Sequence, residues 1–298
     1  IFFAAVQAKI FVSSLPDLNL FHLKRSKHNV HYAYVHHSLL STHTIYLERA
    51  FDHFDSIFCS GPHHVSETRN AERMRGLTPK KLIRHGYARL NTMMAQIHQQ
   101  PGNDFGNRHT SVLIAPSWGP GTILENESLA TEIITRLLAS GFRTTIPPHP
   151  MTQRSSRILL KKLTARFGAA PGFQIDNDIS GTEALAEADL MISDWSGAAL
   201  EFAFGRLRPV LFVDVPRKVN HPNYEALETK PLEVTIRTEI GTIANASKLD
   251  ELPAKVTALL SEGDTMADKI AHARAQYVFN LGDSGRAGAQ RIADQLPA

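Results

Sequence analysis

The feature that most constrains the fold is a regular alternation of short apolar runs with longer amphipathic stretches between residues 112 and 213. Each apolar run ends in a loop rich in Pro, Gly, Ser or Asp, as buried strands do. In the amphipathic stretches, apolar residues recur at helical spacing, and Asn126 and Gly141 are suitable start and stop residues for the first helix. Strands that alternate with helices over short connections predict a parallel sheet covered by helices on both faces.

The same pattern places the individual elements of this half of the chain. We expect a helix over Ser196–Phe204, stopped by Gly205. The capping box Ser180-Gly181-Thr182-Glu183 is expected to open another short helix. The strands are expected at Val112–Ala115, Arg143–Ile146, Phe173–Ile175, Leu190–Ser193 and Pro209–Val213.

The region before it is less regular but again α/β. Strands are expected at Ile10–Ser13, Val30–Val35, Ser56–Cys59 and Leu82–His85, with a helix over Ser66–Arg75. This region is short for a doubly wound domain, so we expect its first strands to precede residue 1. The segment Pro101-Gly102-Asn103-Asp104 is the expected linker. The predicted ranges are 1–100 for a partial N-terminal domain, 108–270 for a second domain and 271–298 for C-terminal helices.

The composition narrows the classes of partner and compartment. There are 32 Lys and Arg against 29 Asp and Glu, and the net charge of +3 permits an anionic ligand or an acidic membrane surface but requires neither. The single cysteine, Cys59, excludes a disulfide framework and a zinc ribbon and fits a reducing compartment. No apolar stretch approaches the roughly 20 residues of a transmembrane helix.

Several common site motifs are absent from the sequence. It has no G-x-G-x-x-G after a strand, no G-x-S-x-G and no G-x-x-x-x-G-K-S/T, which argues against a nicotinamide dehydrogenase, an α/β-hydrolase and a P-loop enzyme. It also lacks H-E-x-x-H, so we expect no metal, and nothing in it calls for a cofactor. The densest basic run, His22–His28, has no interleaved aromatic residues, so no nucleic-acid partner is expected.

The segment Ile192-Ser193-Asp194-Trp195-Ser196-Gly197 lies between a predicted strand and a predicted helix. Ligands of open parallel sheets bind at this carboxyl edge, and the free N–H groups of a helix N-terminus suit a phosphate. The hydroxyls of Ser193 and Ser196 are candidate donors to phosphate oxygens. The alternative is a purely local role, in which Ser196 caps the helix and Asp194 is a turn residue.

The segment Pro147-Pro148-His149-Pro150 follows another strand of the same predicted sheet. Its prolines restrict the backbone and would hold His149 at the carboxyl edge. A histidine there can donate to a phosphate oxygen or protonate a leaving group. The alternative is a loop histidine without a chemical role.

The segment Tyr34-Val35-His36-His37-Ser38 follows a strand of the first domain. If the two sheets face each other, one imidazole of this pair can take a proton from an attacking hydroxyl. The alternative is a pair of structural histidines, since nine of the fifteen histidines lie between His22 and His64.

Together these segments resemble the CDP-glycerol glycerophosphotransferase family, which includes the teichoic acid polymerases. The resemblance rests on the order and spacing of Val35-His36-His37-Ser38, Gly86-Tyr87-Ala88-Arg89-Leu90-Asn91, Ile114-Ala115-Pro116-Ser117-Trp118, His149-Pro150 and Ser193-Asp194-Trp195-Ser196-Gly197. The chain departs from the family pattern at Ser38, where the family has Gly, and at Trp195, where it has Tyr.

The resemblance implies a GT-B arrangement, in which two Rossmann-like domains face a cleft, the first N-terminally incomplete and on the acceptor side, the second holding the nucleotide donor. It implies transfer of glycerol phosphate, or a similar polyol phosphate such as ribitol phosphate, from CDP-glycerol or a related CDP-polyol, with release of CMP. The acceptor would be a hydroxyl of an anionic polymer or a lipid-linked molecule. The implied location is cytoplasmic and peripheral, at the inner face of the cell membrane.

The resemblance also implies roles for single residues. His37 matches the family's proposed base, and His149 and Ser196 match its pyrophosphate-binding positions, so His37 and His149 are expected to be catalytic. The residues expected to contact the donor are Ser193, Asp194, Ser196, Gly197, Pro116, Ser117 and Trp118. The residues expected to contact the acceptor or a phosphate are His36, Ser38 and Arg89.

Two other functions remain open at this point. The same fold could carry a nucleotide-sugar glycosyltransferase or an enzyme like the UDP-N-acetylglucosamine 2-epimerases, because fold does not fix function. The nucleotide that is released would separate these from the first hypothesis. A third hypothesis is a non-catalytic domain that binds an anionic polymer.

Overall fold

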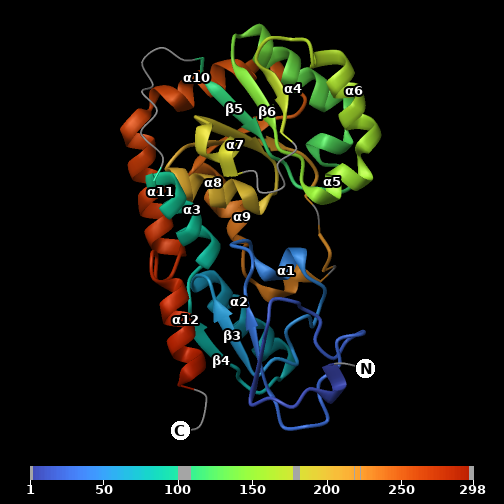
Figure 1. Cartoon of the computed structure of the whole chain (residues 1–298), viewed down its shortest axis with the longest axis vertical. Helices are drawn as coiled ribbons and strands as arrows, with labels where there is room; N and C mark the ends of the chain where they lie inside the picture. The colour runs from blue at the N-terminus through green and yellow to red at the C-terminus, as the bar shows by residue number, and fades with distance from the viewer. Residues whose placement is uncertain (1–2, 100–108, 177–181, 218, 222, 295–298) are drawn as a thin grey trace. The chain divides into compact units, whose positions relative to one another are not determined.

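The computed structural model describes residues 3–99, 109–176, 182–217, 219–221 and 223–294 (Figure 1). The chain forms two compact units, each built on its own parallel sheet. Unit 1 comprises Ile1–Thr92, Val219–Val234 and Arg274–Ala298, and unit 2 comprises Met93–Lys218 and Thr235–Ala273. The prediction of an α/β fold with two Rossmann-like sheets is confirmed.

The two units divide the chain in a more interleaved way than the ranges predicted from the sequence. Val219–Val234 lies within the predicted 108–270 domain but groups with unit 1. Most of the predicted C-terminal helical region also groups with unit 1. The predicted linker Pro101-Gly102-Asn103-Asp104 lies outside the described residues.

Unit 1 contains a four-stranded sheet with the order β1-β2-β3-β4, and all neighbouring strands are parallel. The strands are β1 (Ile10–Ser13), β2 (His31–Val35), β3 (Ser56–Cys59) and β4 (Lys81–Arg84). The central strand β3 is buried along its whole length. Burial on both faces is what its mainly apolar sequence predicts for a strand inside a parallel sheet.

The helices of unit 1 include α1 (Thr42–Ile45), α2 (Pro62–Arg75) and α12 (Ser284–Ala293), with 3-10 turns η1 (Phe3–Ala5) and η4 (Tyr224–Leu227). Helix α2 begins before the predicted Ser66, because Pro62 fits the first turn, where its missing N–H is not needed. It ends at Gly76, whose φ of 60° is a conformation that glycine adopts readily. Three of the four points at which the chain changes unit fall within helices, namely α3 (Ala88–Gln99), α9 (Leu232–Thr235) and α11 (Gly263–Tyr277).

Unit 2 contains a six-stranded parallel sheet with the order β10-β9-β8-β5-β6-β7. Its strands are β5 (Ser111–Ile114), β6 (Arg143–Ile146), β7 (Phe173–Ile175), β8 (Leu190–Ser193), β9 (Val210–Asp214) and β10 (Gly241–Asn245). The first five lie within one residue of their predicted positions, whereas β10 was not predicted. The chain runs outward from β5 to β7 and then returns to β8 on the other side of β5.

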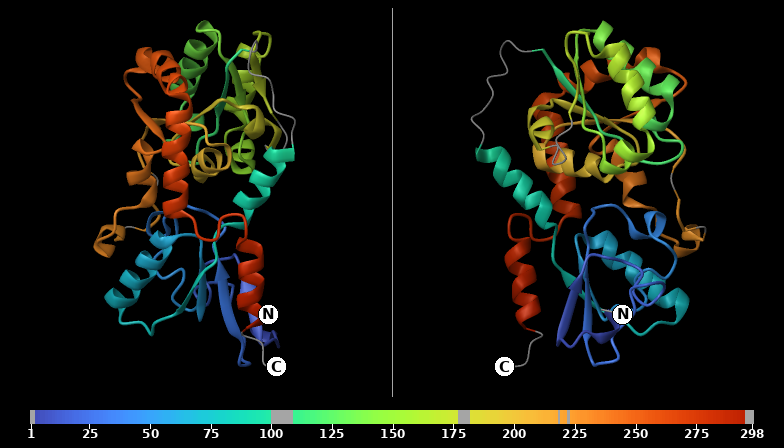
Figure 2. Two further views of the ribbon diagram at one scale, coloured as in Figure 1. Left: turned by 90° about the vertical axis from the view of Figure 1, so that its left-hand side faces the viewer. Right: turned by 45° about the vertical axis from the view of Figure 1, so that its right-hand side comes forward.

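The helices of unit 2 are α4 (Glu127–Ala139), α5 (Pro150–Ser155), α6 (Arg157–Phe167), α7 (Thr182–Glu187), α8 (Gly197–Arg206) and α10 (Leu252–Ser261), with 3-10 turns η3 (Ile123–Glu125), η5 (Ile236–Thr238) and η6 (Leu249–Glu251). Helices α4 and α6 lie on one face of the sheet and α8 on the other (Figure 2). The side chain of Asn126 caps α4 as predicted, accepting from the Leu129 N–H at 3.1 Å.

Helix α8 continues through the predicted stop at Gly205, because the left-handed end residue is Leu207, with a φ of 53°. Ser180 and Gly181 of the predicted capping box lie outside the described residues. Across the described ranges, no helix combines the length and apolar character needed to cross a membrane.

Candidate functional site

The loops that follow β5 and β8 leave the unit 2 sheet at adjacent positions. Because the chain returns to the far side of β5 after β7, the connections from β5 and β8 lead away in opposite directions. Open α/β sheets bind ligands outside the carboxyl ends of their strands at such a reversal. The loop after β5 contains Pro116, Ser117 and Trp118, and the loop after β8 contains Asp194 and Ser196. Segments that were predicted separately therefore meet at one edge of the sheet.

The carboxylate of Asp194 joins these two loops. Its Oδ1 accepts hydrogen bonds from the backbone N–H groups of Ser117 at 2.7 Å and Trp195 at 2.6 Å, and its Oδ2 accepts from Ile123 at 3.4 Å. Asp194 is only 1% exposed. A buried carboxylate that accepts three backbone bonds holds both loops in one geometry, so Asp194 organises the site rather than facing solvent.

The serines on either loop differ in their hydrogen bonding. The Ser193 hydroxyl is buried and donates to the carbonyl of Ala115 at 2.8 Å. This places Ser193 in the link between β8 and β5, and not at the surface expected for a phosphate donor. The Ser117 Oγ is also buried but has no hydrogen-bond partner. A buried hydroxyl without a partner can be satisfied by an oxygen of a bound ligand.

Helix α8 begins where the Asp194 loop ends. Ser196 is its N-cap, with Oγ accepting from the Ala198 N–H at 3.3 Å. This is the local role foreseen for Ser196. The ten-residue helix directs its first N–H groups and positive potential toward the same edge of the sheet. Gly197, at the first helical position, has no side chain to cover those groups.

The structure places Trp118 beside His149. Their rings are nearly parallel, at 17°, with centroids 6.2 Å apart, and both residues are exposed on unit 2. His149 is the N-cap of α5, and its Nδ1 accepts from the Met151 N–H at 3.1 Å. The proton of the neutral ring is therefore on Nε2, which is a hydrogen-bond donor. The pair presents an aromatic face next to a donor suited to an anionic oxygen.

Arg237 is a member of this region that the sequence reasoning missed. Its guanidinium carbon lies 4.1 Å from the centroid of the Trp195 ring, and its Nη1 donates to Asp214 Oδ1 at 2.9 Å. Burial lowers the pKa of Arg237, and the Asp214 carboxylate opposes this effect. Its Nε and Nη2 are buried without hydrogen-bond partners. No sequence signal marks Arg237, because it lies outside every motif and reaches Trp195 only through the tertiary fold.

In unit 1, His37 is exposed just after β2 and lies near two tyrosine hydroxyls. The Tyr34 Oη is 3.2 Å from Nδ1, and the Tyr46 Oη is 3.5 Å from Nε2. Partial burial lowers the pKa of His37, while a hydrogen bond to the Ser14 backbone raises it by less. The ring is therefore neutral near pH 7, and a neutral exposed imidazole can accept a proton.

His36 turns into the core of unit 1 instead. It is 4% exposed, and its ring stacks on that of His64 with centroids 3.7 Å apart. Burial, followed by the neighbouring imidazoles, holds the pKa of His36 well below its ordinary value. The expectation that His36 contacts an acceptor does not fit this position, because the ring is enclosed by protein. His36 has the structural role that was the alternative for the pair.

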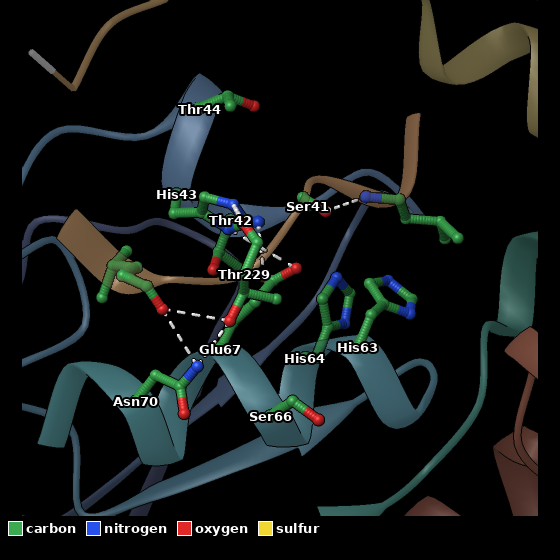
Figure 3. A network of polar contacts seen from close by, with 12 residues as sticks. Ser41, Thr42, His43, Thr44, His63, His64, Ser66, Glu67, Asn70 and Thr229 are labelled. Atoms are coloured by element: carbon green, nitrogen blue, oxygen red, sulfur yellow. Dashed lines mark hydrogen bonds and ion pairs between the residues drawn. The ribbon is translucent and has the colours of Figure 1, made fainter. Parts of the chain in front are cut away.

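The loop that follows His37 is held by the first turn of α2 (Figure 3). His63 and His64 donate through Nε2 to the carbonyls of Leu39 and Leu40, each at 2.9 Å. Both ring contacts fix backbone groups that would otherwise be unpaired in a half-buried loop. Part of the histidine cluster in the sequence thus has a positioning role.

A buried carboxylate holds the start of α1, into which this loop leads (Figure 3). Glu67 Oε2 accepts from the Thr42 N–H at 2.7 Å and from its hydroxyl at 2.6 Å. Burial raises the pKa of Glu67, but the side chain of His43, 3.6 Å from Oε1, together with the rings of His63 and His64 outweighs it and brings the pKa to about 2. His43 in turn donates through Nε2 to the Thr229 carbonyl at 2.9 Å. These contacts tie 219–234 to the loop after β2.

The other predicted acceptor residues are Ser38, which lies in this loop, and Arg89, which lies on a separate helix. The Ser38 Oγ accepts from the Leu40 N–H at 3.1 Å and closes a turn. Arg89 is an exposed residue in the first turn of α3. Tyr87, two residues earlier, donates through its hydroxyl to the His37 carbonyl at 3.1 Å.

Within the described ranges, no three His, Cys, Asp or Glu side chains are grouped so that they could hold a metal ion.

The fold is similar to that of solved enzymes of low sequence identity. A variant of the wall teichoic acid polymerase TagF soaked with CDPG is 14% identical over 97% of this chain and 72% of that one, with a TM-score of 0.56. A putative UDP-N-acetylglucosamine 2-epimerase from Listeria monocytogenes is 16% identical over 89% of this chain and 67% of that one, with a TM-score of 0.54.

A third similar structure is the UDP-GlcNAc 2-epimerase of Methanocaldococcus jannaschii in complex with UDP-GlcNAc and UDP. It is 14% identical over 81% of this chain and 61% of that one, with a TM-score of 0.51. No protein-family model matches the chain, and no curated protein matches its sequence. At these identities the likeness shows the fold alone, and this fold is the GT-B-like one expected from the sequence.

Proposed function

We propose that this chain is a transferase that moves glycerol phosphate, or a similar polyol phosphate, from a CDP-activated donor to an acceptor hydroxyl and releases CMP. The observation that carries the proposal is the edge of unit 2 where Asp194 holds the β5 and β8 loops beside the N-terminus of α8. A strand-order reversal, a helix N-terminus and an unpartnered Ser117 hydroxyl occur together there. This combination suits the phosphates of a nucleotide donor.

The proposal divides the donor contacts between backbone and side chains. The first N–H groups of α8 and the Ser117 hydroxyl hold phosphate oxygens, and His149 donates from Nε2 to the leaving phosphate. Trp118 offers an exposed ring on which a flat base can stack. Pro116 and Gly197 shape the backbone, while Ser193 and Asp194 keep the loops in place without touching the donor.

His37 is the proposed base. In the reaction, the acceptor hydroxyl gives its proton to His37 as its oxygen forms a bond to the β-phosphorus of the donor. The bond between that phosphorus and the oxygen of CMP breaks, and its electron pair leaves with CMP. Such transfers depend mainly on positioning and on stabilising charge at the phosphates. Proposed acceptors are an anionic polymer or a lipid-linked molecule, at the cytoplasmic face of a membrane.

A second candidate is a nucleotide-sugar enzyme. The likeness to the Listeria epimerase, with a TM-score of 0.54, is nearly as high as that to the TagF polymerase, at 0.56. The α8 N-terminus and the Trp118–His149 pair would suit a uridine diphosphate group equally well. The identity of the base therefore decides between the two candidates.

The test is calorimetric titration of the full chain with CDP-glycerol, CDP, CMP, UDP and UDP-N-acetylglucosamine, supported by thermal unfolding. A ligand at 100 times its dissociation constant should stabilise the chain by about 2.7 kcal/mol. We expect cytidine ligands to bind selectively, and His149→Ala to weaken that binding. The matched control is His272→Ala, an exposed histidine on α11.

The titration separates the candidate functions. Uridine selectivity would overturn the phosphotransferase proposal in favour of sugar chemistry. Equal effects of His149→Ala and His272→Ala would remove His149 from the site. Binding of an anionic polymer without any nucleotide binding would reject both enzymatic candidates.

A further inference from the structure

A long stretch of unit 2 carries positive charge without any acidic residue. From Ile133 to Ile175 the chain has seven Lys and Arg and no Asp or Glu. The chain as a whole is nearly balanced, with 32 basic and 29 acidic residues. The imbalance is therefore local, and it runs from the second half of α4 to β7.

Most of these cations are displayed on two consecutive short helices. The exposed ones on α5 and α6 are Arg154, Arg157, Lys161, Lys162 and Arg166. Helix α6 lies beside the unit 2 sheet and α5 lies next to α6 (Figure 1). Several like charges on one exposed surface repel one another, so such a surface calls for an anionic partner.

Acidic side chains of neighbouring elements neutralise little of this surface. Glu127 at the start of α4 pairs with Lys162 at 2.6 Å. Glu125 approaches the same region but accepts from the hydroxyl of Ser155 at 3.0 Å. Among the residues that the structure describes, no carboxylate pairs with Arg154, Arg157 or Lys161. The positive charge at the centre of the surface is left for a partner.

An apolar side chain stands in the middle of these cations. Ile158 is 75% exposed, more than any other large apolar residue of the described chain. On α6, the buried face is formed by Leu159, Leu163 and Phe167, and the Phe167 ring contacts Phe173 of β7. Ile158 and Lys161, three residues apart, lie on the opposite face. An exposed isoleucine flanked by Arg and Lys is costly in water but suits the boundary between lipid headgroups and acyl chains.

The adjoining groove has the same mixed character. It has a volume of about 700 Å³ and runs between α6 and the edge strand β7. Arg157 and Lys161 line it with charge, while Leu160, Phe173 and Ile175 line it with apolar surface. A soluble polyanion would pair with the cations but leave this apolar surface exposed to water. An anionic amphiphile would pair with the cations and also bury the apolar surface.

We propose that the α5–α6 surface binds the anionic surface of a lipid bilayer, with Ile158 inserted at the headgroup level and Arg154, Arg157 and Lys161 over the lipid phosphates. The partner is the bilayer itself and not one lipid species. Attraction comes from the cations and falls with salt, and Ile158 adds a contribution that salt does not weaken. The inference does not depend on the reaction proposed above.

The test is co-sedimentation of the full chain with vesicles of phosphatidylcholine alone or mixed with phosphatidylglycerol. We expect binding only to the mixed vesicles. Arg157→Gln/Lys161→Gln should raise the lipid concentration for half-binding roughly 10- to 30-fold, as expected for two cations at an anionic surface. Ile158→Ser should raise it about tenfold, from the lost apolar burial. All three residues are exposed, so the variants should keep the thermal unfolding of the parent chain.

The matched control is Lys255→Gln/Lys269→Gln, which removes the same charge from α10 and α11 of unit 2. An equal loss of binding in this control would reduce the effect to net charge and overturn the assigned surface. Inorganic polyphosphate serves as the soluble polyanion. If the chain binds polyphosphate but not mixed vesicles, or if Ile158→Ser binds mixed vesicles as well as the parent chain, the bilayer is the wrong partner.

Discussion

The Oδ1 atom of Asp194 lies 2.7 Å from the backbone nitrogen of Ser117, 77 positions away in the sequence, and accepts its N–H. This bond connects the carboxyl ends of β8 and β5, the two neighbouring strands between which the strand order reverses. Because the same oxygen also accepts from Trp195, the loops cannot separate without exposing a buried charge. The geometry of the candidate donor site thus depends on one carboxylate.

Asp194→Asn should therefore destabilise the chain and weaken nucleotide binding together. The amide has one acceptor oxygen, and its NH₂ group would face a backbone N–H that Asp194 now satisfies. Losing such bonds in a buried position costs about 2 kcal/mol in the free energy of unfolding. Urea denaturation measures the change. Asp268→Asn, at an exposed position of α11, should change it by less than about 0.5 kcal/mol. Equal values for both variants would contradict the role given to Asp194.

His37→Ala should abolish most turnover while leaving nucleotide binding intact. Loss of a general base lowers kcat by about 100-fold or more. CMP release from CDP-glycerol and calorimetry on the same samples separate the two effects, with the exposed His28→Ala as control. Because burial lowers the pKa of His37, its basic form persists below pH 6.5, so kcat should fall only at more acidic pH. A rate that declines already at pH 7, or a His37→Ala variant with normal kcat, would exclude this base.

His36→Phe should make the chain less sensitive to acid. The buried His36 stays neutral in the folded state, whereas the unfolded chain binds a proton near pH 6.5. The unfolded state then carries more protons, so the free energy of unfolding falls as pH drops below 6.5. Phenylalanine keeps the stacked ring and removes this loss, which is about 1.4 kcal/mol per pH unit for one histidine. Urea denaturation from pH 8 to pH 5 should show equal slopes above pH 7 and a shallower slope for the variant below pH 6.5. Parallel curves throughout would show that His36 titrates normally.

Gly86→Ala should be more costly than a typical glycine substitution. Gly86 has a φ of 94°, and a Cβ there would lie 2.2 Å from the carbonyl oxygen of Phe279. Gly141 also has a positive φ, of 80°, but a Cβ there would meet nothing within 4 Å. Gly141→Ala should therefore lower the free energy of unfolding only by the cost of backbone strain, about 1 kcal/mol. Gly86→Ala should lower it by about 3 kcal/mol or more, because the clash adds to the strain. Urea denaturation of both variants gives the difference in the free energy of unfolding. Similar losses in the two variants would mean that the backbone around Phe279 shifts at little cost to make room for the Cβ.

The strands of unit 2 could be predicted because their signal is local. Each is a short apolar run between loop-forming residues, and burial on both faces of a parallel sheet requires that pattern. The positions of Asp194, His149 and His37 just after strands were predictable for the same reason. The short helix α1 and the strand β10 were missed, because four residues are too few for a helical period and β10 alternates exposed and buried residues next to polar segments.

The roles of the site residues were decided by contacts between distant parts of the chain. The sequence could not show the order in which the strands pair, and the Asp194–Ser117 bond, the Trp118–His149 pair and the Arg237–Trp195 stack all depend on that order. Nor could it show which histidine of the 36–37 pair faces the core. The amino-acid sequence by itself determined the alternation of strands and helices and the residues at the strand ends, because these depend on neighbours along the chain. Strand order, burial and hydrogen-bond partners were decided by the tertiary structure, since they depend on residues brought together only when the hydrophobic surfaces of separate elements pack.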